Sequence, residues 1–340
     1  MNMTREIIAK NELDFETQGR RDYYVKVEQP TIWGQYLIPV TVIVGPNAEA
    51  GKGVVAIGST HGNEYEGPVA IKHLLKTINT DDVLGRIILI PVLNISAFKA
   101  GKRDTPEDGK NLNREFPGDA NGTITQKFAD IITTYIFPQV HVVLDLHAGG
   151  LVCRFPETAS FHHVEDEEQF KTMQAVSRGF GCEFTMFYQD ETAGLLTSTA
   201  EKLGKITIGT ELGHGQSVNY AGVEMAKRGI LNAAIFSGQL KDIGLPEKIY
   251  SDQKLVDGSS ARSSMLAPFD GIFEPCCDLG ARVNEGDVVA ILHQFDRIDE
   301  EPLEILASQD GYIITQAWEA IVQQGQTITL IAQLTEWSHS

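Results

Sequence analysis

The chain has 340 residues, 42% of them hydrophobic, which is enough to bury the cores of two domains. Its net charge of −18 argues against nucleic acids and anionic membranes as partners, because both bind basic patches. Residues 255–340 hold 14 Asp and Glu but only 3 Arg, so most of the acidity lies in the C-terminal quarter.

No stretch of the sequence reaches the roughly 20 apolar residues of a membrane span, and the first residues show no apolar run behind a basic start. We therefore expect a cytoplasmic protein without a secretory signal. The chain has four cysteines, Cys153, Cys182, Cys276 and Cys277. They show no C-x-x-C spacing, which is typical of free thiols in a reducing compartment.

Strands and helices alternate over the first 250 residues. Apolar, β-branched runs predict strands over 38–44, 53–57, 86–93, 140–146 and 205–210. Helical patterns occupy 68–75, 125–135, 167–180 and 225–240. The alternation predicts an α/β domain over residues 1–250, with a mainly parallel sheet covered by helices. In such sheets the active residues gather beyond the carboxyl ends of the strands.

Residues 251–340 have a different texture, with short strand-like pieces separated by Gly, Pro and Asp. Two similar halves, beginning near Ala267 and Ser308, resemble the barrel-sandwich modules of lipoyl and biotinyl domains. A cofactor carrier needs a lysine to acylate, and no lysine follows Lys254. The sequence therefore favours a small all-β C-terminal domain that acts as a cap or scaffold.

The segment 59–67 carries a candidate metal-binding pair between a predicted strand and a helix. His61 and Glu64 stand three residues apart, so both side chains can converge on one point. Imidazole and carboxylate are both good zinc ligands. This pair alone is also typical of a simple turn that ends in a helix-opening acid.

A second histidine, His147, ends another predicted strand. Together with His61 and Glu64 it completes a set of two imidazoles and one carboxylate, which leaves the fourth tetrahedral position of a zinc ion open for water. Asp145 lies two residues earlier on the same strand face. It either orients His147 or bonds to nearby backbone.

A loop rich in turn formers supplies candidate groups for binding the substrate. Asn113 and Arg114 offer an amide and a guanidinium fork, which suit a substrate carboxylate. Arg103 is a candidate donor to the oxyanion that develops in acyl transfer, or else a surface charge of its loop.

Glu211 ends the strand predicted over 205–210 and is the candidate general base for metal-assisted hydrolysis. His214 is an alternative ligand, which the complete set of three makes unnecessary. Four other histidines are interpreted as surface or packing residues: His73, His141, His162 and His163.

The order of these motifs resembles the succinylglutamate desuccinylase/aspartoacylase family of zinc enzymes. The likeness lies in His61-Gly62-Asn63-Glu64, Asn113-Arg114, Asp145-Leu146-His147, Glu211 and the β-rich C-terminal part. It implies a three-layer sandwich like that of the zinc carboxypeptidases, and one zinc ion per chain on His61, Glu64 and His147. It also implies that Glu211 is the general base, that Asn113 and Arg114 bind the α-carboxylate, and that Arg103 polarises the scissile carbonyl.

Within the family, the segments 61–68, 111–118 and 147–150 look closest to the ectoine-utilisation branch, whose members are taken to deacetylate Nα-acetyl-L-2,4-diaminobutyrate. The resemblance implies a deacylase that cleaves the amide bond of a small N-acyl amino acid with metal-activated water. Two rivals stay open, a zinc carboxypeptidase for small peptides and a non-catalytic metal-binding protein. The sequence also leaves the acyl group, the amino acid and homo-oligomer formation open.

Overall fold

The computed structural model describes residues 6–30, 32–189, 192–244 and 252–337. Its α-helices are α1 (Glu66–Thr77), α2 (Ile95–Ala100), α3 (Ile124–Ile131), α4 (Glu167–Arg178), α5 (Leu196–Glu201) and α6 (Tyr220–Phe236). The strands before residue 245 are β1 (Glu6–Ile8), β2 (Gly19–Glu28), β3 (Gln35–Val44), β4 (Gly53–Gly58), β5 (Arg86–Ile90), β6 (Val140–His147), β7 (Cys153–Arg154), β8 (Thr158–His162), β9 (Phe184–Tyr188) and β10 (Ile206–Glu211). Those after residue 251 are β11 (Lys254–Asp257), β12 (Ser264–Leu266), β13 (Gly271–Pro275), β14 (Arg282–Val283), β15 (Val288–His293), β16 (Leu303–Leu306), β17 (Gly311–Ala317), β18 (Ile321–Val322) and β19 (Thr327–Thr335).

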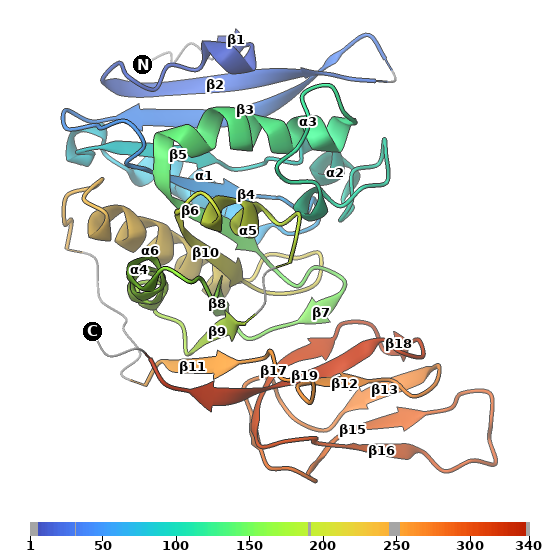
Figure 1. The fold of residues 1–340 in the computed structure, drawn as a ribbon. Helices are drawn as coiled ribbons and strands as arrows, with labels where there is room; N and C mark the ends of the chain where they lie inside the picture. Colours follow the sequence, from blue (N-terminus) through green and yellow to red (C-terminus); the bar gives the residue numbers. More distant parts are fainter. Residues whose placement is uncertain (1–5, 31, 190–191, 245–251, 338–340) are drawn as a thin grey trace.

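One long mixed sheet runs through the molecule in the order β1-β2-β3-β5-β4-β6-β10-β8-β9-β11-β19-β17-β14 (Figure 1). The pairs β5–β4, β4–β6 and β6–β10 at its centre are parallel, whereas β2–β3, β3–β5 and β10–β8 are antiparallel. A separate antiparallel sheet has the order β16-β15-β13-β18. The predicted α/β class, with a mainly parallel mixed sheet and an additional β-rich part, is confirmed.

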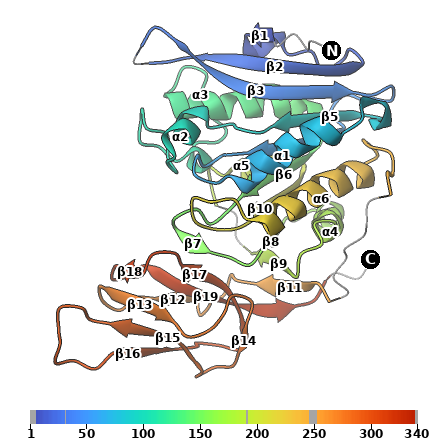
Figure 2. The ribbon, with the colours of Figure 1, turned by 180° about the vertical axis from the view of Figure 1, so that it is seen from behind.

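Helices cover both faces of the central sheet, and the strands contribute to a core on each side. Along β4, Val54 and Ala56 belong to the same cluster as residues of α1, α4 and α6, while Val55 and Ile57 belong to the cluster that includes α3 and α5. Figure 2 shows α1 and α6 in front of the sheet, whereas α3 lies on the opposite face in Figure 1. Burial on both faces explains why β4 carries no polar side chain.

The C-terminal part is hydrogen-bonded to this sheet at two places. Strand β11 pairs in parallel with β9 and antiparallel with β19, so it extends the main sheet. Strand β17 pairs with β7, and the backbone N–H of Trp318 donates to the carbonyl of Val152. The domain boundary expected at residue 250 falls in 245–251, outside the described residues, and stays a prediction.

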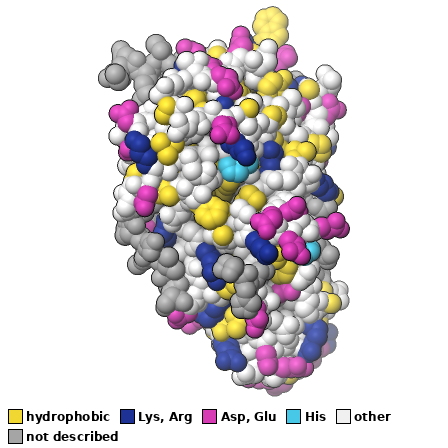
Figure 3. Space-filling view, turned by 60° about the vertical axis from the view of Figure 1, so that its left-hand side comes forward, with side chains coloured by type: hydrophobic (Ala, Val, Ile, Leu, Met, Phe, Trp, Pro, Cys, Tyr) yellow, Lys and Arg dark blue, Asp and Glu magenta, His cyan; other side chains and the backbone are white. Residues whose placement is uncertain are grey.

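The predicted elements agree with the structure except at their ends. The strand expected over 86–93 ends at Ile90, and the helix expected over 125–135 is an α-helix only to Ile131, followed by a wider π-type turn over Ile132–Ile136. Among the described residues, no helix combines the length and the apolar character needed to span a membrane. On the face drawn in Figure 3, Asp and Glu side chains lie interspersed with Lys and Arg.

Candidate active site

Three neighbouring parallel strands end where the candidate residues lie. Strand β4 lies beside β6, and β6 beside β10, with Glu211 directly opposite His147. After β4 the chain turns through Ser59, whose φ of 56° is in the left-handed region. This turn leads to His61 and Glu64, just before α1 begins at Glu66. The expectation that the site lies at the carboxyl ends of parallel strands is therefore met.

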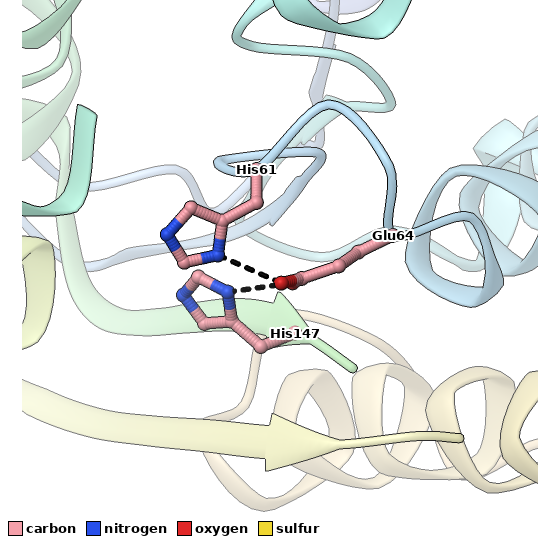
Figure 4. Close-up of side chains that lie close together, drawn as sticks. All are labelled: His61, Glu64 and His147. Atoms are coloured by element: carbon pink, nitrogen blue, oxygen red, sulfur yellow. Dashed lines mark hydrogen bonds and ion pairs between the residues drawn. The ribbon is translucent and has the colours of Figure 1, made fainter. Parts of the chain in front are cut away.

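The two histidines and the glutamate converge on one point, as Figure 4 shows. Nδ1 of His61 lies 2.8 Å from one carboxylate oxygen of Glu64, and Nδ1 of His147 lies 2.9 Å from the other. One ligand atom from each residue falls within 4.8 Å of the other two. In the described part of the chain, no other group of His, Cys, Asp and Glu side chains meets in this way.

The outer nitrogens of both imidazoles have their own partners. Nε2 of His61 lies 3.1 Å from Oδ1 of Asn111, and Nε2 of His147 lies 2.8 Å from a carboxylate oxygen of Asp145. Asp145 in turn accepts a hydrogen bond from the hydroxyl of Thr60. Partners of this kind fix the ring orientation and leave Nδ1 free for a metal. Of the two roles considered for Asp145, the structure supports the orienting one.

The charges of the three groups suit a divalent cation. Burial alone would raise the pKa of Glu64, but the two neighbouring histidines outweigh it and hold that pKa well below its usual range. Burial lowers the pKa of His61, which favours the neutral ring that binds metal. Burial alone would lower the pKa of His147 too, but Asp145 and Glu64 raise it. With two Nδ1 atoms and a charged carboxylate directed at one point, the residues fit a zinc ion.

Glu211 lies next to this group as a half-buried acid with one fully buried oxygen. Among the described residues its Oε2 atom has no hydrogen-bond partner. Burial first, and next the negative charge of Glu64, raise the pKa of Glu211 to about 8. A carboxyl group with a pKa near the working pH can both take up and release a proton, which is the property of a general base.

The three candidate substrate-binding residues reach the same cavity, which has a volume of about 280 Å³. Arg103 donates a hydrogen bond of 3.0 Å to Glu64, so its guanidinium lies at the metal group and not on an outer surface. Arg114 is exposed, with Nη1 bonded to the carbonyl of Asn113. The Asn113 amide is engaged on both sides, because Oδ1 accepts from the N–H of Leu196 and Nδ2 lies 3.1 Å from Nε2 of His147.

One sequence interpretation changes in the structure. His162 is not a surface residue: its side chain is 12% exposed, lines the cavity and contacts Glu201. His214, whose role as a ligand the sequence made unnecessary, lies outside the group of His61, Glu64 and His147, and its ring centroid lies 5.4 Å from that of Trp318. The sequence contains a signal for the buried position of His162. Over residues 158–162, polar residues alternate with Ala159 and Phe161, which is the pattern of a half-buried strand.

Comparisons with known proteins identify the family of the chain. The succinylglutamate desuccinylase/aspartoacylase catalytic domain matches residues 50–236. The chain is 33% identical over 331 residues to an N-alpha-acetyl-L-2,4-diaminobutyric acid deacetylase of Halomonas elongata, covering 95% of this chain and 94% of the relative.

Solved structures extend the likeness to nearly the whole fold. A succinylglutamate desuccinylase/aspartoacylase of Rhodobacter sphaeroides has a TM-score of 0.88 at 30% identity, covering 96% of this chain and 98% of that one. The product-bound ectoine utilization protein EutE (DoeB) of Ruegeria pomeroyi has a TM-score of 0.86 at 32% identity, covering 95% and 98%. Fold, site and relatives together define a hydrolytic enzyme that acts on N-acyl amino acids. The chain belongs to the succinylglutamate desuccinylase/aspartoacylase family, and its likeness to the ectoine-utilisation branch is confirmed.

Proposed function

We propose that the enzyme is a zinc-dependent deacetylase of Nα-acetyl-L-2,4-diaminobutyrate, with one zinc ion per chain on His61, Glu64 and His147. The main support is that the ligand atoms of these three side chains converge within 4.8 Å, beside Glu211, whose buried Oε2 atom has no hydrogen-bond partner among the described residues. The substrate follows the name of the Halomonas relative. We also propose the carboxypeptidase-like layering of the N-terminal part, supported by helix-lined cores on both faces of the sheet.

The residues around the metal site have separate roles in the reaction. A zinc ion, when bound, supplies a Lewis acid and lowers the pKa of water. Glu211 takes a proton from the attacking water and delivers it to the departing amine. Arg103, whose guanidinium lies at the metal group, donates to the carbonyl oxygen as negative charge builds on it.

The amino-acid end of the substrate is fixed by the loop around Arg114. Its guanidinium is exposed to the cavity and offers a fork to the α-carboxylate. Asn113 is more enclosed, and its amide holds His147 and Leu196 in place beside that fork. Binding energy at this end orients the scissile amide relative to Glu211.

The test combines metal analysis with a release assay on the purified enzyme. Acetyl-, succinyl- and formyl-amino acids are compared with a short peptide that has a free carboxyl terminus. The proposal predicts stoichiometric zinc and fastest release from acetyl-diaminobutyrate, with both lost in His147→Ala. Preferred cleavage of the peptide would instead support the carboxypeptidase, and full turnover in a metal-free His61→Ala protein would overturn the ligand assignment.

A further inference from the structure

A second buried carboxylate, that of Glu201, reaches the active-site cavity through an imidazole. The Glu201 side chain is 2% exposed, and its two oxygens lie 3.0 and 3.1 Å from Nδ1 of His162. The hydroxyl of Thr207 also donates to this carboxylate. Glu201 ends α5, whereas His162 ends β8 and lines the cavity. The proposed mechanism uses neither residue.

The sheet places this pair on the same face as the proposed base. Strand β10 pairs antiparallel with β8, so Glu211 lies opposite Thr158 and Gly209 lies opposite Ser160. Side chains two residues apart on a strand share a face, and His162 therefore follows Ser160 on the face that carries Glu211. Gly209, on the same face, leaves space between His162 and Glu211. A Cβ at this position would lie 2.7 Å from the hydroxyl oxygen of Ser160.

The hydrogen bonds determine what the imidazole offers to the cavity. A carboxylate only accepts, so Nδ1 of His162 is the donor toward Glu201. In the neutral ring, Nε2 is then an acceptor with a lone pair. The negative charge of Glu201 behind the ring attracts a cation to this acceptor.

The surrounding residues favour a cationic group over an anionic one. Tyr188 lies beside the imidazole, with ring centroids 5.7 Å apart, and an aromatic ring within reach further stabilises an ammonium. The two arginines that line the cavity, Arg103 and Arg114, come from the loop on the metal side. A substrate carboxylate beside His162 would face the charge of Glu201, whereas an ammonium would be neutralised by it.

We propose that His162, held by Glu201, forms a subsite for the side-chain ammonium of the substrate. This inference depends on the proposed function, since it concerns the far end of the same substrate. His162 touches the ammonium through Nε2, and Glu201 is a positioning residue that acts through His162. The subsite makes the enzyme select N-acyl diamino acids over N-acyl amino acids with neutral or acidic side chains.

The experiment compares two substrates that differ in one ammonium group, Nα-acetyl-L-2,4-diaminobutyrate and N-acetyl-L-2-aminobutyrate, on the zinc-loaded enzyme. Glu201→Gln keeps an acceptor for Nδ1 and removes the charge. It should lower kcat/KM for the diamino substrate about ten- to hundredfold, the range expected for a hydrogen bond to a charged group, mainly through KM. The value for the neutral substrate should stay within about twofold. Glu274→Gln is the matched control, because Glu274 pairs with His293 at 2.7 Å on the C-terminal part.

Each outcome separates the subsite from the proposed function. Equal loss for both substrates, or none for either, overturns the subsite and leaves the deacylase in place. A wild-type enzyme that prefers the neutral substrate, or N-acetyl-aspartate, overturns it as well. A wild-type enzyme that releases acetate from none of them overturns the proposed function itself. If Glu201→Gln fails to fold, His162→Gln is tested instead, and the same comparison of kcat/KM between the two substrates decides whether the subsite exists.

Discussion

Replacing Glu211 by Gln should change the stability of the metal-free protein in a pH-dependent way. The buried carboxyl has a pKa of about 8, against 4.5 for an ordinary glutamate. Between these values the folded state holds a proton that the unfolded state has lost. The free energy of unfolding therefore falls as the pH rises through this interval. Gln cannot ionise, so the variant escapes this loss.

The size of the effect follows from the interval between the two pKa values. Each pH unit corresponds to about 1.4 kcal/mol, so the full cost of ionising buried Glu211 is on the order of 5 kcal/mol above pH 8 and about 3 kcal/mol at pH 7. It vanishes below pH 4.5. The Gln side chain adds an amide N–H without a partner, which costs about 1–3 kcal/mol at every pH. The change with pH, and not the absolute difference, is therefore the measure of the Glu211 environment.

The assay is urea unfolding of both proteins, stripped of metal, at pH 5, 7 and 9. The free energy of unfolding of the variant, relative to that of the wild type, should rise by several kcal/mol between pH 5 and 9. Glu274→Gln, at an exposed position, should show no such trend. Parallel pH curves for wild type and Glu211→Gln would refute the raised pKa. With zinc restored, the same variant should keep its metal and lose about 10²–10⁴ in kcat, because the proposed general base is gone.

Four further substitutions test other parts of the site. His61→Ala should abolish zinc content and turnover together, as measured by metal analysis and acetate release. Asp145→Asn should weaken metal binding about 10–100-fold in a chelator competition, because the orienting carboxylate is lost. Arg114→Lys should raise KM about tenfold with kcat nearly unchanged, since an ammonium lacks the guanidinium fork. Gly62→Ala should destabilise the fold by about 3 kcal/mol in thermal or urea melts, because its Cβ would lie 2.1 Å from the backbone of Ala97.

The central strands could be predicted because they are buried on both faces. The runs that became β4 and β5 are apolar at nearly every position, which is typical of a strand between two helix layers. Strand β2 was missed, since its opening Arg20-Arg21-Asp22 carries charge. Strand β8 was missed because it is five residues long and its polar side chains face the cavity. His162 ends β8, and because this strand was not predicted, His162 was interpreted as a surface residue.

The candidate metal-binding group of His61, Glu64 and His147 could be predicted because its residues stand at or just after the ends of strands that the sequence predicts. The partners of that group were harder to foresee. Asn111 caps the short helical turn over Leu112–Arg114 by accepting from the N–H of Asn113, and the same Oδ1 atom faces His61. The left-handed backbone position after β4 is occupied by Ser59 and not by a glycine, so the residue type does not predict it. Both features depend on loops that come into contact only in the folded chain, so the local sequence does not predict them.

The relation of the C-terminal part to the cavity follows from hydrogen bonding that no composition reveals. Cys153, which lines the cavity, lies on the two-residue strand β7, and its Cα partner in the sheet is Ala317 of β17. A strand of two residues is too short to hold its place alone. Because β11 also continues the sheet beyond β9, removing the C-terminal part would leave two strand edges open and one cavity wall unsupported. The C-terminal part therefore supports the cavity wall around Cys153, even though it supplies none of the three candidate metal ligands.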